Sequence, residues 1–171
     1  YLISGPPIDH ETGVYSLDLE ADGYKYIFFS LAALQLAREL NWTPDILHAN
    51  DWHTAAAVYS LALRRPVEKS FGSTTSLLTV HNLPYLGSMT ASGLEAFGLP
   101  PAINSDLPPW AQHMALPLGL LTADSIVAVS PGYASEILTE EFGAGLDSFL
   151  VSHQEKIRGI LNGLDTIRWD P

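Results

Sequence analysis

The fold of this chain is decided by residues 44–54, which read PDILHANDWHT. Within this stretch, residues 46–49 form a short apolar run bounded by turn residues, which is the pattern of a strand buried on both faces. Residues 53–65 follow as an Ala-rich and Leu-rich segment without Gly or Pro, and this predicts a helix. A strand that leads directly into a helix is the first half of a βαβ unit.

The same pattern recurs further along the chain. Residues 76–81 (SLLTVH) predict a second strand, at a distance of about 30 residues that suits one βαβ unit. Residues 125–129 and 158–161 predict a third and a fourth strand of the same kind. Strands that alternate with helices in this way predict an α/β fold with a parallel sheet and crossover helices.

Other elements are indicated by local signals between these strands. Residues 1–3 predict a short strand, and residues 26–40 predict a helix because apolar residues recur there at helical spacing. Ser130 is placed to cap a helix over residues 130–139, with Pro131 at its first position. Residues 87–109 are rich in Gly, Pro and Ser, which predicts a mobile loop or a loop with a short helix of its own.

The composition excludes several classes of protein. The chain has 171 residues, 47% of them hydrophobic, which is enough for one core. Its net charge of −11 argues against a nucleic-acid partner, and no apolar stretch approaches the roughly 20 residues that span a bilayer. The absence of cysteine excludes thiolate sites and a Cys nucleophile. Because the sequence begins at Tyr1 inside an apolar run, we expect it to be a piece of a longer chain.

Polar residues follow three of the predicted strands at the point where each strand ends. These segments are residues 48–53 (HANDWH), 81–87 (HNLPYLG) and 162–165 (NGLD). Ligands of open parallel sheets bind beyond the carboxyl ends of the strands. Imidazoles, amides and a carboxylate beside the flat faces of Trp52 and Tyr85 suit a sugar.

Two other interpretations stay open at this point. Asn and Asp often end strands because their side chains satisfy turn backbone groups, and a His at a strand end is often structural. A metal site is the rival chemical interpretation, but its candidate ligands straddle a strand-to-helix turn and would point apart. Those candidate ligands are His48, Asp51, His53 and His81. None of the eight Lys and Arg residues lies in the three segments, so no cationic side chain is available there to hold a diphosphate.

At these segments the sequence resembles the bacterial glycogen synthase and plant starch synthase family of glycosyltransferases. Residues 44–54 are similar to the family's PD(V/I)(V/L)HxxDWHT segment, and residues 79–87 to its TxHNLxYxG segment. Further similar segments lie at residues 123–124, 129–137, 141–147, 159–166 and 169–171. The resemblance runs in register from residue 42 to the end of the sequence.

The resemblance implies a two-domain GT-B enzyme that adds glucose from ADP-glucose or UDP-glucose to the non-reducing end of an α-1,4-glucan with retention. This chain, residues 1–171, would be part of the N-terminal, acceptor-side domain, a Rossmann-like mostly parallel sheet with helices on both faces. The C-terminal nucleotide-binding domain would be absent, so the fragment alone would be inactive. The implied location is the bacterial cytoplasm or, in a plant, the plastid stroma.

The resemblance also assigns roles to individual residues. His81 and Asp51 would be catalytic, gripping the donor glucose, with the His81 main-chain carbonyl and ring near the reacting carbon. The substrate-binding residues would be Asn82, Asn162, Tyr85, Trp52 and His53. Neither a metal nor a cofactor is implied.

One segment departs from the family pattern. The family has KAG before its YYAD segment, whereas this chain has Pro117-Leu118-Gly119, and a Pro there predicts a kinked helix. A different class of function also stays open, a stand-alone glucan-binding or regulatory module without catalysis. Trp52, Tyr85 and Trp110 would be its sugar platforms.

Overall fold

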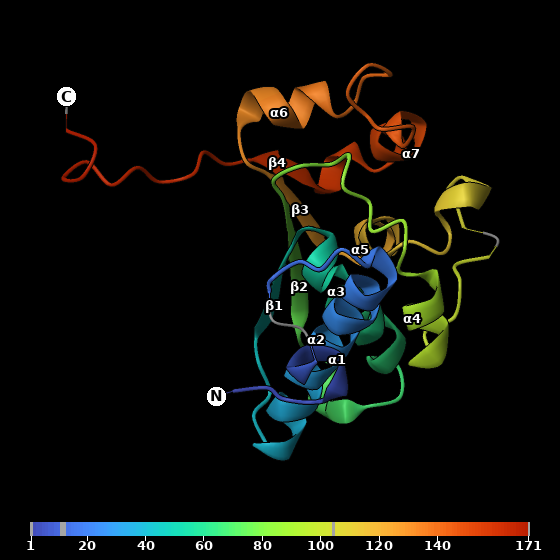
Figure 1. Ribbon diagram of the computed structural model, residues 1–171. Coiled ribbons are helices and arrows are strands. Elements are labelled where there is room, and N and C mark those ends of the chain that lie inside the picture. The colour runs from blue at the N-terminus through green and yellow to red at the C-terminus, as the bar shows by residue number, and fades with distance from the viewer. Residues whose placement is uncertain (1, 11–12, 104, 171) are drawn as a thin grey trace.

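The computed structural model describes residues 2–10, 13–103 and 105–170, and its centre is a four-stranded parallel sheet (Figure 1). The strands are adjacent in chain order, β1-β2-β3-β4. They are β1 (Ile46–Asn50), β2 (Thr75–Val80), β3 (Ser125–Ala128) and β4 (Ile157–Gly159). The register pairs His48 with Leu77 and Leu78 with Ile126. The predicted α/β fold with a parallel sheet is confirmed, with each strand within two residues of its predicted bounds.

The long helices form a layer against this sheet. Helix α3 (Asp51–Arg64) follows β1 directly and packs against β1 and β2. Helices α2 (Leu19–Glu39) and α5 (Ala115–Thr122) pack against α3 from its two sides. The core lies between the sheet and these helices, where Leu78, Ile126 and Leu118 have no exposed surface. Burying such side chains contributes roughly 1.5–3 kcal/mol each.

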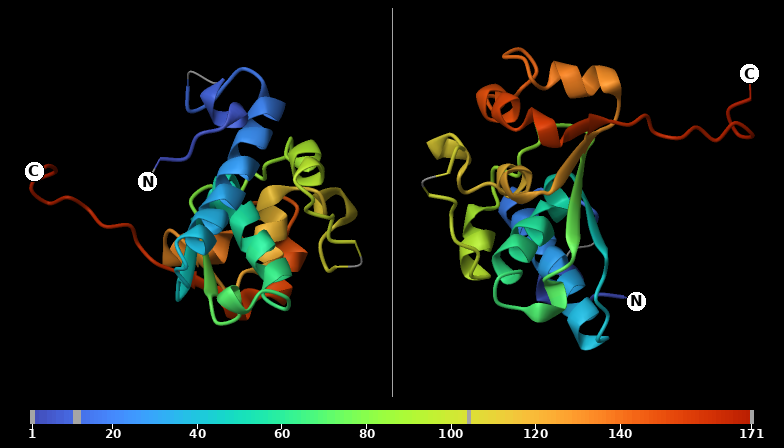
Figure 2. Two further views of the ribbon diagram at one scale, coloured as in Figure 1. Left: turned by 90° about the horizontal axis from the view of Figure 1, so that it is seen from below. Right: turned by 180° about the vertical axis from the view of Figure 1, so that it is seen from behind.

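The long helices lie on one face of the sheet, as the views in Figures 1 and 2 show. On the other face, the side chain of Ile46 is 61% exposed, and His48 and Asn50 are also exposed. We expected helices on both faces of the sheet, but within the described residues the long helices cover only one face. For α3 and α5 the reason is topological, because right-handed crossovers that step in the same direction place their helices on the same side. Helix α2 precedes β1 and joins this layer by packing against α3.

Shorter elements complete the described chain. The predicted helix after β3 begins as expected, because the Ser130 side chain accepts a hydrogen bond from the Tyr133 amide at 2.9 Å. The short α-helices are α1 (Pro6–Asp9), α4 (Ala91–Ala96), α6 (Pro131–Glu136) and α7 (Asp147–Ser152). The 3-10 helices are η1 (Lys69–Phe71), η2 (Pro109–Ala111) and η3 (Gln154–Lys156). Helix α4 is the short helix expected within residues 87–109.

Three predictions about local structure need correction. Leu2 and Ile3 are not in a strand, since they pair with none of the four strands found among the described residues, and Tyr1 lies outside those residues. Helix α2 begins seven residues earlier than predicted, because Asp18 caps it through the amides of Glu20 and Ala21. Pro117 does not break α5, because it lies in the first turn, where its missing amide would have no partner within the helix.

The final segment, residues 160–170, is exposed throughout and extends away from the body of the molecule (Figure 1). Its last bond to the sheet runs from the Ile160 amide to the Ala128 carbonyl at 2.9 Å. Among the helices that the structure describes, none has the length and the apolar character needed to cross a membrane.

Candidate functional site

The carboxyl ends of β1 and β2 are tied together by side chains from the two predicted motifs. The Asp51 carboxylate accepts a hydrogen bond from the His81 amide at 2.7 Å. The His81 ring Nε2 lies 3.3 Å from Asn50 Oδ1. The structure therefore brings together the two residues that were expected to be catalytic, Asp51 and His81, on neighbouring strand ends.

Asp51 has an unusual backbone conformation, with a φ of 53°. It stands between the extended Asn50 and the first turn of α3. The Thr54 hydroxyl stabilises this junction, accepting from the Asn50 amide at 2.6 Å and donating to the Asn50 carbonyl at 2.8 Å. A left-handed conformation at a residue other than glycine costs roughly 1–2 kcal/mol and is common at functional sites. It places the Asp51 carboxylate over the end of β2.

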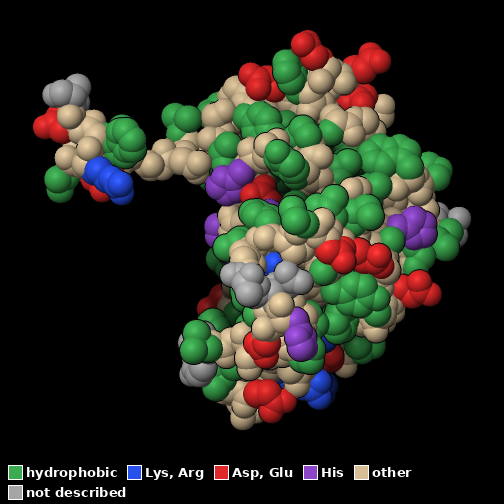
Figure 3. Space-filling view, viewed as in Figure 1, with side chains coloured by type: hydrophobic (Ala, Val, Ile, Leu, Met, Phe, Trp, Pro, Cys, Tyr) green, Lys and Arg blue, Asp and Glu red, His purple; other side chains and the backbone are tan. Residues whose placement is uncertain are grey.

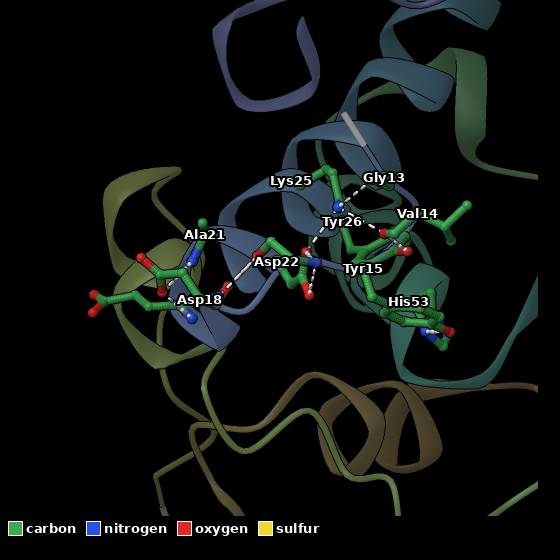
Figure 4. Close-up of polar contacts among 11 residues, drawn as sticks. Gly13, Val14, Tyr15, Asp18, Ala21, Asp22, Lys25, Tyr26 and His53 are labelled. Carbon is green, nitrogen blue, oxygen red and sulfur yellow. Dashed lines mark hydrogen bonds and ion pairs between the residues drawn. The ribbon is translucent and has the colours of Figure 1, made fainter. Parts of the chain in front are cut away.

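Beside this pair, aromatic rings from three segments form a cluster on the first turn of α3, and Figure 4 shows Tyr15, Tyr26 and His53 of this cluster. The ring centroids of Trp52 and His53 lie 4.3 Å apart. The ring centroid of Tyr26 lies 5.1 Å from that of Trp52 and 4.6 Å from that of His53. The Tyr15 hydroxyl lies 2.8 Å from His53 Nε2, and the ring centroids of these two residues are 5.6 Å apart. The predicted substrate residues Trp52 and His53 are thus held between α2 and the segment before it.

Burial changes the protonation of this cluster. Burial lowers the pKa of His53 below its ordinary 6.5, and the nearby Asp51 and Asp22 carboxylates oppose that shift. Burial, with the charges of Tyr15 and Asp22, raises the pKa of Tyr26 to about 12. At neutral pH the lowered pKa leaves His53 mainly as a neutral imidazole, whose Nε2 pairs with the Tyr15 hydroxyl.

A pocket of about 570 Å³ lies against the cluster. Tyr15, Trp52 and His53 form one side, and residues 84–90 form the other. Tyr85, a predicted substrate residue, is 63% exposed at its rim. The lining combines flat apolar faces with a few polar groups, which is the composition of a pocket for a small ligand or a sugar.

Two of the five predicted substrate-binding residues do not line this pocket, and neither do Asp51 and His81. Asn82 is exposed between His81 and the pocket wall, and its carbonyl accepts from the Tyr85 amide at 3.3 Å. Asn162 lies in the exposed segment 160–170, with no hydrogen bond to Asp51 or His81 among the described residues. The segments that follow β1 and β2 therefore meet at the carboxyl ends of these strands, whereas the third predicted segment, residues 162–165, does not join them.

The structure separates the candidate ligands of the rival metal site. His48 lies on the open face of the sheet, where its Nε2 is 2.8 Å from Thr79 Oγ1, while His53 lies in the aromatic cluster. In the part of the chain that the structure describes, no group of three His, Cys, Asp or Glu residues could hold a metal ion. Lys and Arg side chains are sparse on the face drawn in Figure 3, in keeping with the charge of −11.

Sequence reasoning missed the residues that α2 and the preceding segment contribute. Tyr15, Asp22 and Lys25 lie in the pocket wall or directly behind it. The helical pattern of residues 26–40 indicated the helix but carried no sign of this role. Only the Ser16-x-Asp18 turn before α2 was a usable local signal, as an N-cap.

The fold is that of a Rossmann-like α/β domain, and the candidate site lies at the carboxyl ends of its strands, where such sheets bind ligands. The model of the starch synthase catalytic domain matches residues 1–152. The chain belongs to this family of glycosyltransferases.

Individual relatives agree with that assignment. A glycogen synthase of Lactococcus lactis is 38% identical over 155 residues, which cover 88% of this chain and 32% of that protein. A glycogen synthase of Aromatoleum aromaticum is 39% identical over 176 residues, covering 100% of this chain and 34% of that protein. The catalytic domain of starch synthase IV from Arabidopsis thaliana, solved with ADP and acarbose bound, is 32% identical with a TM-score of 0.74. That match covers 92% of this chain and 32% of the solved chain, so this chain spans about a third of the length of these relatives.

Proposed function

We propose that residues 1–171 form part of the N-terminal, acceptor-side domain of a glycogen or starch synthase. The complete enzyme transfers glucose from ADP-glucose or UDP-glucose to the non-reducing end of an α-1,4-glucan with retention of configuration. Family membership supports this, as does the bond between Asp51 and the His81 amide, which is the single observation that carries the proposal. The related starch synthase that was solved with ADP and acarbose supports the ligand classes.

In this proposal, Asp51 and His81 grip the donor glucose. Asp51 uses Oδ1 for the His81 amide, and Oδ2 has no hydrogen bond within the described residues, so it is available to a sugar hydroxyl. The His81 ring is exposed beside it and can bond a second hydroxyl. Oxygen atoms held close to the reacting carbon stabilise the positive charge that develops in an oxocarbenium-like transition state.

The glucan acceptor occupies the aromatic pocket. Tyr15, Trp52 and Tyr85 offer ring faces to the apolar faces of glucose units, and His53 offers a polar edge. Asn82 lies between the donor and acceptor positions, and Asn162 reaches the donor when residues 160–170 pack against a second domain. No metal or cofactor takes part.

The nucleotide is held mainly by that second, C-terminal domain. Three of the eight cations of this chain are engaged elsewhere, with Lys25 buried on Asp22, Arg65 paired with Asp124 and Arg64 near Glu68. A sugar diphosphate needs cationic or helix N-terminal partners, and the first kind is not available at this edge. We place the enzyme in the bacterial cytoplasm or, in a plant, the plastid stroma.

The test is glucose transfer by the complete protein that carries this chain. Labelled ADP-glucose and UDP-glucose are supplied with maltoheptaose, and the new linkage is read by proton NMR. We expect a lengthened glucan with a new α-1,4 bond, and the residue 1–171 fragment should give none. A β linkage, or no transfer with either donor, would contradict the proposal.

The aromatic pocket specifically favours one second candidate, a glucan-binding or regulatory module without catalysis. The same preparation distinguishes it. Maltoheptaose binding by calorimetry with no transfer from either nucleotide sugar would favour the module over the synthase.

A further inference from the structure

One wall of the pocket is a short segment that no apolar core holds in place. In this segment, residues 13–17, which we term the strap, the side chains of Val14, Tyr15 and Leu17 are 71%, 61% and 106% exposed. Apolar burial is the usual force that fixes a segment in position, and the strap has almost none. Its position over His53 therefore depends on polar contacts.

The polar contacts to the strap backbone come from Asp22, Lys25 and Tyr26 near the start of α2 (Figure 4). Lys25 Nζ donates to the carbonyl of Val14 at 2.7 Å and to that of Gly13 at 3.4 Å. The Tyr26 hydroxyl donates to the same Val14 carbonyl at 2.7 Å. The Ser16 amide donates to both carboxylate oxygens of Asp22, at 3.1 and 3.0 Å. The backbone of the strap is thus bonded on both sides of Tyr15.

Asp22 and Lys25 are themselves almost completely buried. They are 2% and 6% exposed, and Lys25 Nζ lies 2.7 Å from Asp22 Oδ1. Burial alone would raise the pKa of Asp22, but the bonds from Lys25 and Ser16 outweigh it and lower that pKa below its ordinary value. A buried ion pair is costly to form and is weak evidence for stability in its own right. Its geometry, with both partners also bonded to the strap backbone, suits positioning.

The same turns of α2 also contact the opposite wall of the pocket. A Cβ atom at Gly23 would lie 2.5 Å from the Met89 carbonyl, so the helix backbone directly touches residues 84–90 at this point. In that wall, the Thr90 hydroxyl donates to the Gly87 carbonyl at 2.6 Å and accepts from the Ala115 amide at 3.0 Å. The start of α2 therefore sets the distance between the two walls.

We propose that Asp22 and Lys25 are positioning residues that fasten the strap to α2, so that Tyr15 closes the pocket against His53. Because the occupant is the glucan acceptor, this inference rests on the proposed function. Asp22 borders the pocket, but its carboxylate oxygens are already bonded to the Ser16 amide and to Lys25 Nζ, so the pair is not the group that recognises the glucan. It acts through Tyr15, and its loss opens one wall of the pocket while leaving Asp51 and His81 in place.

The first measurement is hydrogen exchange of the strap in the complete protein. In Asp22→Asn and Lys25→Met, exchange at the Ser16 amide should rise about tenfold or more, as expected when a hydrogen bond to a charged group is lost. Tyr26→Phe removes one hydroxyl from the Val14 carbonyl and keeps the buried pair, so a smaller rise is expected even if the other variants fold poorly. Glu68→Gln, which removes one partner of the Arg64 ion pair on α3, is the matched control and should leave the strap unchanged.

The second measurement is maltoheptaose binding and kinetics in the same variants. The Kd and KM for maltoheptaose should rise about tenfold, whereas kcat at saturating acceptor and KM for the nucleotide sugar should change less than about twofold. Unchanged exchange at Ser16, or faster exchange with unchanged glucan affinity, would overturn the inference. If the wild type binds maltoheptaose but transfers no glucose, the proposed synthase activity fails while the strap result stands. If it does not bind maltoheptaose, both fail.

Discussion

Asp51 combines a strained backbone with a bonded carboxylate, and the two features have one origin. The chain must pass from the end of β1 into α3 within one residue, and the positive φ makes that turn possible. The turn directs the carboxylate at the His81 amide. Asp tolerates this conformation better than most residues other than glycine, so a carboxylate can occupy the position at moderate cost.

This origin predicts an unusual order of stability among variants. Asp51→Gly should be more stable than Asp51→Ala by about 1 kcal/mol, because only glycine enters this conformation without steric cost. The measurement is the free energy of unfolding in urea. Equal stabilities, or a more stable Ala variant, would show that the strain is absent.

At the amino ends of the strands, Asp124, which directly precedes β3, has a structural role. It pairs with Arg65, and its Oδ2 accepts from the Ser76 amide at 2.7 Å and the Ser76 hydroxyl at 2.8 Å. Burial raises the pKa of Asp124, but the bonds from Arg65 and Ser76 are stronger and lower it to about 2 from the ordinary 3.8. The unfolded chain therefore binds a proton at this residue more readily than the folded chain does.

The sign of the resulting pH dependence follows directly. The stability that ionised Asp124 contributes is complete above pH 3.8 and is lost as the pH falls toward about 2. In urea unfolding between pH 5 and pH 2, the wild type should therefore lose more stability than Asp124→Asn. Parallel curves for the two proteins would contradict this.

At the scale of elements, α3 and α5 approach closely because α5 has glycine at the contact. A Cβ atom at Gly119 would lie 2.8 Å from the Ala55 side chain and 3.1 Å from Leu78 Cδ2. Both helices are fixed on the sheet, so neither can move away without disturbing the core. The family pattern also has glycine in this segment, and packing explains it here.

We therefore expect Gly119→Ala to destabilise the fold. Helix propensity favours the Ala by about 1 kcal/mol, but overpacking costs typically 1–3 kcal/mol, and the net loss should be about 1 kcal/mol. Thermal unfolding measures it, and Gly163→Ala, where no atom lies within 4 Å of the added Cβ, is the control. An increase in stability at position 119 would show that the helices can separate freely.

The sequence predicted those elements whose signals are local. Each strand was an apolar run between turn residues. The start of α6 was indicated by Ser130, a favourable N-cap residue, followed by Pro131 at the first helical position. The start of α2 was missed because its first residues reverse the helical pattern, with Leu19 exposed and the polar Asp22 and Lys25 buried. The effect of Pro117 was misjudged because a proline kinks a helix only beyond the first turn.

For the whole molecule, the part of the candidate site that lies at strand ends could be predicted from the sequence. The rule that ligands bind at the carboxyl ends of parallel strands brought Asp51 and His81 together correctly. It gave no access to Tyr15 or the Asp22–Lys25 pair, since these are placed by tertiary contacts between distant segments. The one-sided helix layer likewise depends on strand order, which no local pattern encodes.

In our proposal the Asp51 and His81 pair, where two strands end, holds the reacting glucose. The most direct measurement is kcat/KM for the nucleotide sugar in the complete protein carrying Asp51→Ala or His81→Ala. Exposed Asp9 and His113 supply matched controls, Asp9→Ala and His113→Ala. We expect each site variant to lose about 100-fold or more in kcat/KM, as when an oriented transition-state partner is removed, and the controls to be unchanged. Parental turnover in both site variants would contradict it.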